Sequence, residues 1–374
     1  MEQKCIVLTR YLYLKDEIEI ACLLSFLNKS ETALFWVFEL YFSGFEDDLL
    51  NLLWKIYYEF YACLNPKFEK FLIEIFEEYK VGSNEKKQKL LFDVVNNFLV
   101  KPYTIDVFML KQVTNNFEID RSNVDLETWL ENKDYEQIAN FILELDLAND
   151  NEIIDVLTKC VDHFIKKNIG LKKTQILKCF KDAPYSNKRV ILLSRIMHYF
   201  ALLNGLKISN KKNISVEFEE SSQYETIVNG EETTFRPYLI LPMACKYGTN
   251  ENKFLFAFKL KRDKYTENEI RDEYDYHWTY HAHKSPVWKT RMESFKGFLD
   301  HKKRRVEFPD DDLLEAFYDE YGYEPDEQKK CVQEKNIPKV SLDKTCNDFY
   351  NTYKNKMLYN VDSNYLIELD KFCL

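Results

Sequence analysis

The chain has 374 residues, of which 45% are hydrophobic and 30% charged, and its formal net charge is −10. This apolar content is enough for a large core and excludes global disorder. No signal-peptide core and no run of about 18 uncharged apolar residues is present, so we expect a soluble protein that is neither secreted nor membrane-spanning. The nine cysteines are odd in number and contain no CxxC pair, which predicts free thiols in a reducing, intracellular compartment.

The first 205 residues have the pattern of successive helices. Apolar residues recur at helical spacing, for example at Leu34, Phe38, Tyr41 and Phe45. Short polar breaks separate these segments at 28–30, 43–44, 65–66, 82–84 and 101–102. Further helices are expected over 122–131, 134–146, 150–168, 173–181 and 186–205. Short helices with short breaks predict an all-α domain over 1–205, built of stacked helical hairpins in an α-solenoid or a bundle.

The segment 35–61 is unusually aromatic, with 11 aromatic residues in 27 positions. Such a block could be a partner-binding surface rich in anchoring side chains. Apolar residues on more than one face of a helix are, however, typical of helices packed between neighbours. We therefore interpret this block as buried core.

The pattern changes after residue 205, which predicts a second, α+β domain over 206–374. Residues 214–219 alternate with period two, and Asn229-Gly230 between two such runs favours a tight hairpin. We therefore expect a small antiparallel β module near 213–261. Helices are expected over 266–283 and 286–296, then a short hairpin or strand over 300–308, a helix from Pro309 to about Tyr321, and a helical C-terminal region from Asp326.

Three stretches carry a resemblance to known proteins. They are 33–44 (ALFWVFELYFSG) with 53–61 (LWKIYYEFY), 277–288, which ends in Ser285-Pro-Val-Trp288, and 308–328 (FPDDDLLEAFYDEYGYEPDEQ). Over most of its length the chain resembles a set of uncharacterised proteins of nucleocytoplasmic large DNA viruses (giant viruses). No activity is attached to that set, so the resemblance implies a viral source and not a mechanism.

Glycine spacing excludes several classes of nucleotide-binding enzyme. The eight glycines are too widely spaced for a Walker A or a dinucleotide-binding loop, which need several within six residues. GxSxG, HExxH, the kinase signature set and an EF-hand loop are also missing. We therefore expect no cofactor, and we assign no catalytic residue.

The best metal-site candidate is the pair His277 and His281, which lie one helical turn apart. One of Asp272, Glu273 or Asp275 could complete a set of nitrogen and oxygen ligands. The alternative is an amphipathic helix whose histidines pack beside aromatic rings, and two histidines at this spacing often arise by chance. The run Asp310–Asp312 is interpreted as a helix N-cap rather than as a cation site.

Charge is distributed unevenly along the chain. Residues 1–160 have a net charge of −13, 161–308 of +10 and 309–374 of −7, and from Lys159 to Lys212 there are 13 basic residues and two acidic ones. A basic stripe could neutralise phosphates of a nucleic acid, bind an acidic protein surface, or be a solvated face. The candidate binding residues are Lys166, Lys167, Lys172, Lys173, Lys178, Lys181, Lys188, Arg189, Arg195, Lys302, Lys303, Arg304 and Arg305.

Because the catalytic motifs tested are missing, we expect a non-enzymatic interaction or scaffold protein of a large DNA virus, for example a virion component. Its expected locations are the host cytoplasm, the viral factory or the virion. The expected partner is a protein, either an acidic one or a second copy of the chain. Two alternatives stay open: a nucleic-acid-binding factor that uses 159–212, and a divergent metal-dependent enzyme centred on His277 and His281.

Overall fold

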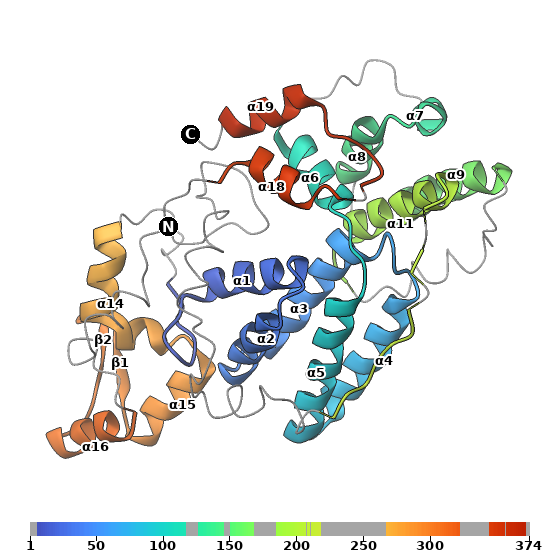
Figure 1. Ribbon diagram of the computed structural model, residues 1–374. Coiled ribbons are helices and arrows are strands. Elements are labelled where there is room, and N and C mark those ends of the chain that lie inside the picture. The colour runs from blue at the N-terminus through green and yellow to red at the C-terminus, as the bar shows by residue number, and fades with distance from the viewer. Residues whose placement is uncertain are drawn as a thin grey trace. The chain divides into compact units, whose positions relative to one another are not determined.

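The structure is a computed structural model, and it describes residues 6–116, 126–145, 150–167, 185–206, 208–209, 211–217, 267–321, 344–355 and 357–371. These residues are mainly helical and include one two-stranded antiparallel sheet (Figure 1). This confirms the predicted fold class. No helix in the described ranges is both long enough and apolar enough to cross a membrane.

The chain divides into two compact units that are both discontinuous in sequence. Unit 1 contains Met1–Leu49 and Glu217–Thr345, and unit 2 contains Leu50–Val216 and Cys346–Leu374. The division therefore falls at other positions than the predicted domain boundary at residue 205. Each unit is described below by itself.

Unit 1 combines helices from both halves of the chain. The helix α3 begins in unit 1 and ends in unit 2. The elements of unit 1 are α1 (Lys15–Leu27), α2 (Thr32–Phe42), the start of α3 (Glu46–Ile56), α14 (Glu267–Ala282), α15 (Pro286–Ser294), β1 (Phe298–Asp300), β2 (Arg305–Glu307) and α16 (Asp311–Tyr321). The helices α1 and α2 form an antiparallel pair across the break at 28–30, while β1 and β2 pair with Leu299 opposite Val306.

A hydrophobic cluster joins the N-terminal segment of unit 1 to its later helices. Leu8, Leu12 and Leu14 pack in one buried cluster with Trp278 and Trp288. The indole Nε1 of Trp288 donates a hydrogen bond of 2.9 Å to the backbone oxygen of Thr9. The loop before α1 is thus part of the core that supports α14, α15 and the hairpin.

Unit 2 is built of helices that pack in successive pairs. After α3 come a π-helical turn η1 (Tyr57–Tyr61), α4 (Phe68–Val81), α5 (Asn84–Val100), α6 (Asp106–Asn116), α7 (Leu126–Asn132), α8 (Tyr135–Leu143), α9 (Asp150–Lys166), α11 (Lys188–Leu203), α18 (Cys346–Tyr353) and α19 (Ser363–Lys371). The pairs α4–α5, α7–α8 and α18–α19 are in contact, and α6 packs against α8, α11 and η1. This agrees with the expected helical hairpins.

The predicted helix ends match the structure closely. Helices end or begin at each of the five predicted breaks, and α7, α8, α9 and α11 start within four residues of their predicted starts. Ser83 caps α5 by accepting a hydrogen bond of 3.3 Å from the amide of Lys86. Asp310 caps α16 in the same way, with 2.9 Å between its Oδ1 and the amide of Leu313, so the N-cap interpretation of the acidic run is confirmed.

The aromatic block over 35–61 is core, as predicted. All of its aromatic side chains except Phe42 are buried. Phe35 and Trp36 meet edge to face, and Trp54 stacks on Tyr58. Aromatic pairs of this kind add stabilisation beyond the area that they bury.

Two sequence expectations fall largely outside the described residues. The helix expected over 173–181 lies there entirely, as does most of the β module expected near 213–261. Residues 213–217, the described part of that module, form no strand. The antiparallel sheet of the described residues is the hairpin β1–β2, where a short hairpin or strand was expected over 300–308.

Candidate functional site

The best chemical candidate from the sequence, the His277–His281 pair, lies on α14 in unit 1. The helix is kinked at His277, whose φ and ψ are −130° and 18°. Beyond the kink, the helix turns Trp278 and Ala282 into the hydrophobic cluster. His281 faces inward as well, and only 1% of its surface is exposed.

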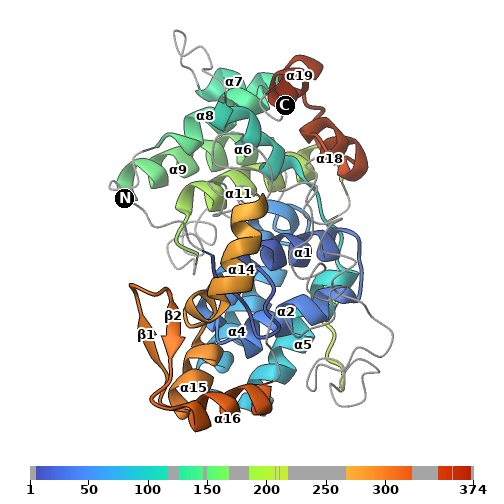
Figure 2. The same ribbon diagram turned by 90° about the vertical axis from the view of Figure 1, so that its left-hand side faces the viewer.

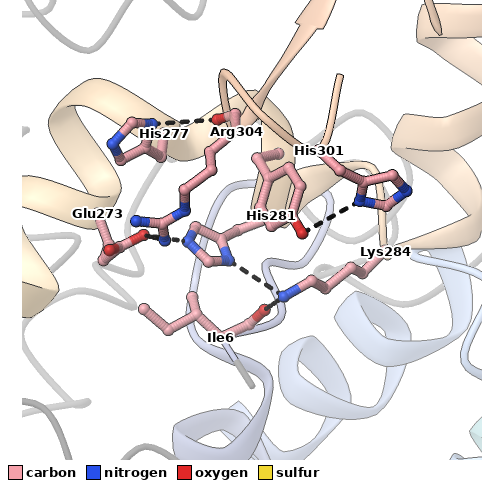
Figure 3. Close-up of polar contacts among 8 residues, drawn as sticks. Ile6, Glu273, His277, His281, Lys284, His301 and Arg304 are labelled. Carbon is pink, nitrogen blue, oxygen red and sulfur yellow. Dashed lines mark hydrogen bonds and ion pairs between the residues drawn. The ribbon is translucent and has the colours of Figure 1, made fainter. Parts of the chain in front are cut away.

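His281 has partners at both ring nitrogens (Figure 3). Its Nε2 lies 2.7 Å from Oε2 of Glu273, and its Nδ1 lies 3.2 Å from Nζ of Lys284. An ammonium group can only donate, so Nδ1 accepts and the ring hydrogen is on Nε2. Lys284 also donates to the backbone oxygen of Ile6 at 3.2 Å, which ties α14 to the N-terminal segment.

Arg304 supplies the counter-charge of this cluster. It lies in the turn between β1 and β2 with a positive φ of 55°, and its Nη2 donates to Oε2 of Glu273. Its backbone oxygen accepts a hydrogen bond of 3.1 Å from Nδ1 of His277. The hairpin turn is thus attached to α14 before the kink, through Glu273, and at the kink, through His277.

The electrostatics of the cluster favour a neutral histidine beside an ionised glutamate. Burial lowers the pKa of His281 to about 4, with Lys284 and Arg304 acting in the same direction against the hydrogen bond to Glu273. Burial alone would raise the pKa of Glu273, but its bonds to Arg304 and His281 outweigh that effect and lower the pKa. The cluster therefore holds one carboxylate, two cations and one neutral imidazole.

This geometry is poorly suited to acid–base or metal chemistry. A general base needs a lone pair within reach of a substrate, whereas Nδ1 of His281 is buried and accepts from Lys284. His277 and His281 are held by different partners and do not converge on one point. Among the described side chains of His, Cys, Asp and Glu, no three are grouped so that they could hold a metal ion.

The basic residues of the hairpin turn lie on the surface. Lys302, Lys303 and Arg305 are exposed, and only Arg304 is half-buried. Lys303 and Arg305 bond to Oε1 of Glu307 at 2.9 Å and 2.6 Å. The turn is an exposed, basic part of unit 1.

The described basic residues of 159–212 have mostly internal contacts in unit 2. Lys166 and Lys167 are exposed at the end of α9, and Lys167 bonds to a carboxylate on α7 at 2.7 Å. Lys188 and Arg189 are half-buried at the start of α11, and Arg189 donates to a backbone oxygen after α8 at 2.6 Å. Four further candidates of this segment lie outside the described residues, namely Lys172, Lys173, Lys178 and Lys181.

Arg195 belongs to the interior of unit 2 rather than to a basic stripe. Its Nη2 bonds to both carboxylate oxygens of Glu69, at 2.8 Å and 2.7 Å. Tyr58 donates to the same carboxylate at 2.6 Å, and Tyr185 stacks on Tyr58. The structure therefore does not bring Arg195 together with the exposed lysines of α9.

The sequence did not predict the buried ion pair that joins the N-terminal segment to α2. Glu39 is fully buried, and it accepts from Nε of Arg10 at 3.0 Å and from the amide of Tyr11 at 2.9 Å. Burial raises the pKa of Glu39, against the effect of Arg10. The only sign of this pair in the sequence is that Glu39 is a single charged residue inside an apolar helical run.

The described cysteines are free thiols, as predicted. Cys22, Cys63, Cys160 and Cys346 are all buried and unbridged. Burial raises the pKa of Cys160 to about 12, and it also raises the pKa values of Cys22 and Cys63. A thiol with a raised pKa is a poor nucleophile, because the thiolate is the reactive form.

Comparison with known proteins leaves the family open. No protein-family model matches the chain, and no curated protein or solved structure matches it either.

Proposed function

We propose that this protein is a non-enzymatic interaction or scaffold protein of a large DNA virus, in line with its sequence resemblance. Its partner is an acidic protein surface, and the contact is made by the hairpin patch, defined as Phe298, Lys302, Lys303 and Arg305. The viral origin and the virion or infected-cell location are part of the same proposal. The observation that carries it is the exposed basic turn on a hairpin whose base packs on the core of unit 1.

The base of the hairpin is fixed to the core of unit 1. Leu299 and Val306 pack on the hydrophobic cluster, and the amide of Val306 donates to Oγ1 of Thr279 at 3.1 Å. The carboxylate of Asp300 accepts from the amides of Lys302 and Lys303 at 2.8 Å and 3.0 Å. A turn that is already ordered loses little conformational entropy when a partner binds.

The outer face of the hairpin offers both charge and an apolar anchor. Side chains alternate along a strand, so Phe298 and Arg305 share the face opposite Leu299 and Val306. Phe298 is 56% exposed, and β1 lies on the side of β2 away from α14 (Figure 2). Lys302 makes no ion pair with any described residue. A basic rim steers an acidic partner, while an exposed ring can supply affinity.

The test uses the full chain as bait for proteins from infected cells, with and without nuclease. The charge-reversal variant Lys302→Glu/Lys303→Glu should lose at least about tenfold of the captured partner, since close charge pairs at an interface cost a few kcal/mol when reversed. The matched control is Lys67→Glu/Lys80→Glu, which makes the same charge change at exposed positions of unit 2. The control should capture as much partner as the natural chain.

Three results would contradict the proposal. The first is that the charge-reversal variant captures as much partner as the control variant. The second is that nuclease releases the captured partner, which would favour the nucleic-acid alternative. A defined substrate turned over by the purified chain would contradict the non-enzymatic assignment.

A further inference from the structure

A row of polar side chains on α5 binds the backbone of another segment of unit 2. The row consists of Asp93 and Asn97, which share one face of α5, and of Lys101, the extended residue that caps the end of the helix. The bound segment is 211–216, which is neither helix nor strand and runs beside α5 (Figure 1). We call these three side chains the α5 clamp.

Asn97 forms the centre of the clamp. Its Nδ2 donates to the backbone oxygen of Ile214 at 2.8 Å, and its Oδ1 accepts from the amide of the same residue at 3.0 Å. The side-chain amide thus satisfies both polar groups of one residue, as the neighbouring strand of a sheet would. Asn97 is completely buried, and a further bond from Nδ2 to the oxygen of Asp93 fixes its orientation.

The two ends of the clamp extend this pattern. Asp93 accepts from the amide of Val216 at 3.1 Å and from the hydroxyl of Ser215 at 3.0 Å. At the other end, Lys101 donates to the oxygen of Lys211 at 3.4 Å. The ammonium of Lys211 in turn donates to the oxygen of Val100 at 2.7 Å, in the last turn of α5, where cations are favoured by the helix dipole.

The spacing of the clamp matches an extended chain. One step of four residues along α5 advances about 6 Å, and two residues of an extended segment advance about 6.6 Å. Asp93 and Asn97 therefore meet Val216 and Ile214, two residues apart, with the segment antiparallel to the helix. The register depends on backbone geometry and not on the identity of most side chains.

The attachment of the segment rests mainly on its backbone, and of its side chains those of Lys211 and Ser215 bond to α5. Five of the six residues over 211–216 are exposed, and only Ile214 is half-buried. Val216 has 42% of its surface in solvent. What α5 recognises is an extended backbone with a basic residue three positions before an aliphatic one, and a hydroxyl residue directly after it.

We propose that the α5 clamp is a docking site for an extended segment of a partner protein, and that residues 211–216 occupy it as an internal competitor. The partner segment has the pattern found at Lys211, Ile214 and Ser215. Main-chain hydrogen bonds provide its affinity, and the three side chains provide its specificity. This site is independent of the hairpin patch, so it goes beyond the proposed function.

The test opens the clamp without changing it. Proline has no amide hydrogen, so Ile214→Pro/Val216→Pro removes two bonds of the internal segment and leaves Asp93 and Asn97 intact. The probe is a fluorescent synthetic peptide with the sequence 209–217, and its binding to the full chain is measured by fluorescence anisotropy. The matched control is Asn213→Pro, which changes an exposed neighbour whose amide is not bonded to the clamp.

A tethered competitor acts at an effective concentration in the millimolar range. The peptide should therefore bind the double-proline chain at least about tenfold more tightly than the natural chain or the Asn213→Pro control. Adding Asn97→Ala to the double-proline chain should abolish this gain. Equal binding to all chains, or binding unaffected by Asn97→Ala, would overturn the proposal.

A second measurement uses the natural chain and does not depend on the proline variant folding. Excess unlabelled peptide should speed hydrogen exchange at the amides of Ile214 and Val216, because it displaces them from the clamp. Unchanged exchange at these amides at millimolar peptide would also overturn the proposal.

Discussion

His281 has bonds at both ring nitrogens, to groups of opposite charge. Glu273 accepts at one side and Lys284 donates at the other, with the guanidinium of Arg304 on the same carboxylate. Protonation of the imidazole would place a new N–H against the Lys284 ammonium. At this residue, the arrangement favours structure over proton transfer.

We predict that His281 in the folded chain stays neutral down to about pH 4. An unfolded histidine takes up its proton near the ordinary pKa of 6.5, so between these values the unfolded chain binds more protons. The free energy of unfolding should therefore fall as the pH is lowered through this range, by about 3 kcal/mol in total from this residue. Replacement His281→Gln keeps one donor and one acceptor and should remove that contribution.

NMR of the His281 imidazole resonances measures the titration directly. Urea unfolding of the natural and His281→Gln chains at pH 7 and pH 4.5 measures the accompanying change in the free energy of unfolding. The variant Lys284→Met tests the direction of the effect, because loss of the ammonium should raise the pKa of His281. A resonance that titrates near pH 6.5 in the folded chain would refute the assignment.

Two helix ends of the same type provide a matched pair of glycines. Gly44 after α2 and Gly205 after α11 both have positive φ, at 84° and 68°. In each case the next amide bonds back across the last turn, from Phe45 to Leu40 and from Leu206 to Ala201, which is a Schellman motif. They differ in their surroundings: a Cβ on Gly44 would lie 2.6 Å from Cβ of Pro286, whereas one on Gly205 would meet nothing within 4 Å.

Gly44→Ala should therefore destabilise the chain more than Gly205→Ala. The positive φ costs both variants about 1 kcal/mol. The clash with the rigid ring of Pro286 adds about 1–3 kcal/mol for Gly44→Ala only. Native-state hydrogen exchange at buried amides of α2 and α11 measures the two losses separately. Equal losses of stability in the two variants would mean that α15 moves away from the end of α2 at little energetic cost.

The elements were predictable from sequence to different degrees. Helix boundaries were predictable because they depend on local capping residues. Ser83 and Asp310, for example, bond to backbone amides only a few residues away. Residues 213–217 alternate like a strand but have no strand partner among the described residues, and Asp93 and Asn97 on a helix bond to their backbone instead. His281 and Arg304 were singled out by type, but their joint contact with Glu273 depends on the kink and on the hairpin turn. Contacts of this range leave no periodic signal.

At the scale of the whole molecule, both units are assembled from distant parts of the chain. The sequence suggested a single boundary at residue 205, because composition and periodicity change there. Compactness follows long-range packing instead, and unit 1 joins 1–49 with residues beyond 216. The segment before α1 is the clearest case, because its leucines lie in the same cluster as Trp288, Val306 and Phe317.

We predict that a chain lacking residues 1–14 loses the order of α14, α15 and α16. Each large apolar side chain removed from the cluster costs about 1.5–3 kcal/mol, and four of them lie in this segment. Loss of Arg10 also leaves the buried Glu39 without its counter-ion, at a cost of about 3–5 kcal/mol. The sum reaches the whole stability of an ordinary domain.

Hydrogen exchange of the truncated chain measures this outcome locally. Amides of α14, α15 and α16 should lose protection, although the deletion lies more than 250 residues earlier in the sequence. Removal of residues 363–374 serves as the control, since α19 packs on α6 and α18 in unit 2. That deletion should leave α14–α16 protected. If the truncated chain keeps α14–α16 protected too, the later helices and the hairpin form a self-sufficient core, and the N-terminal segment only covers it.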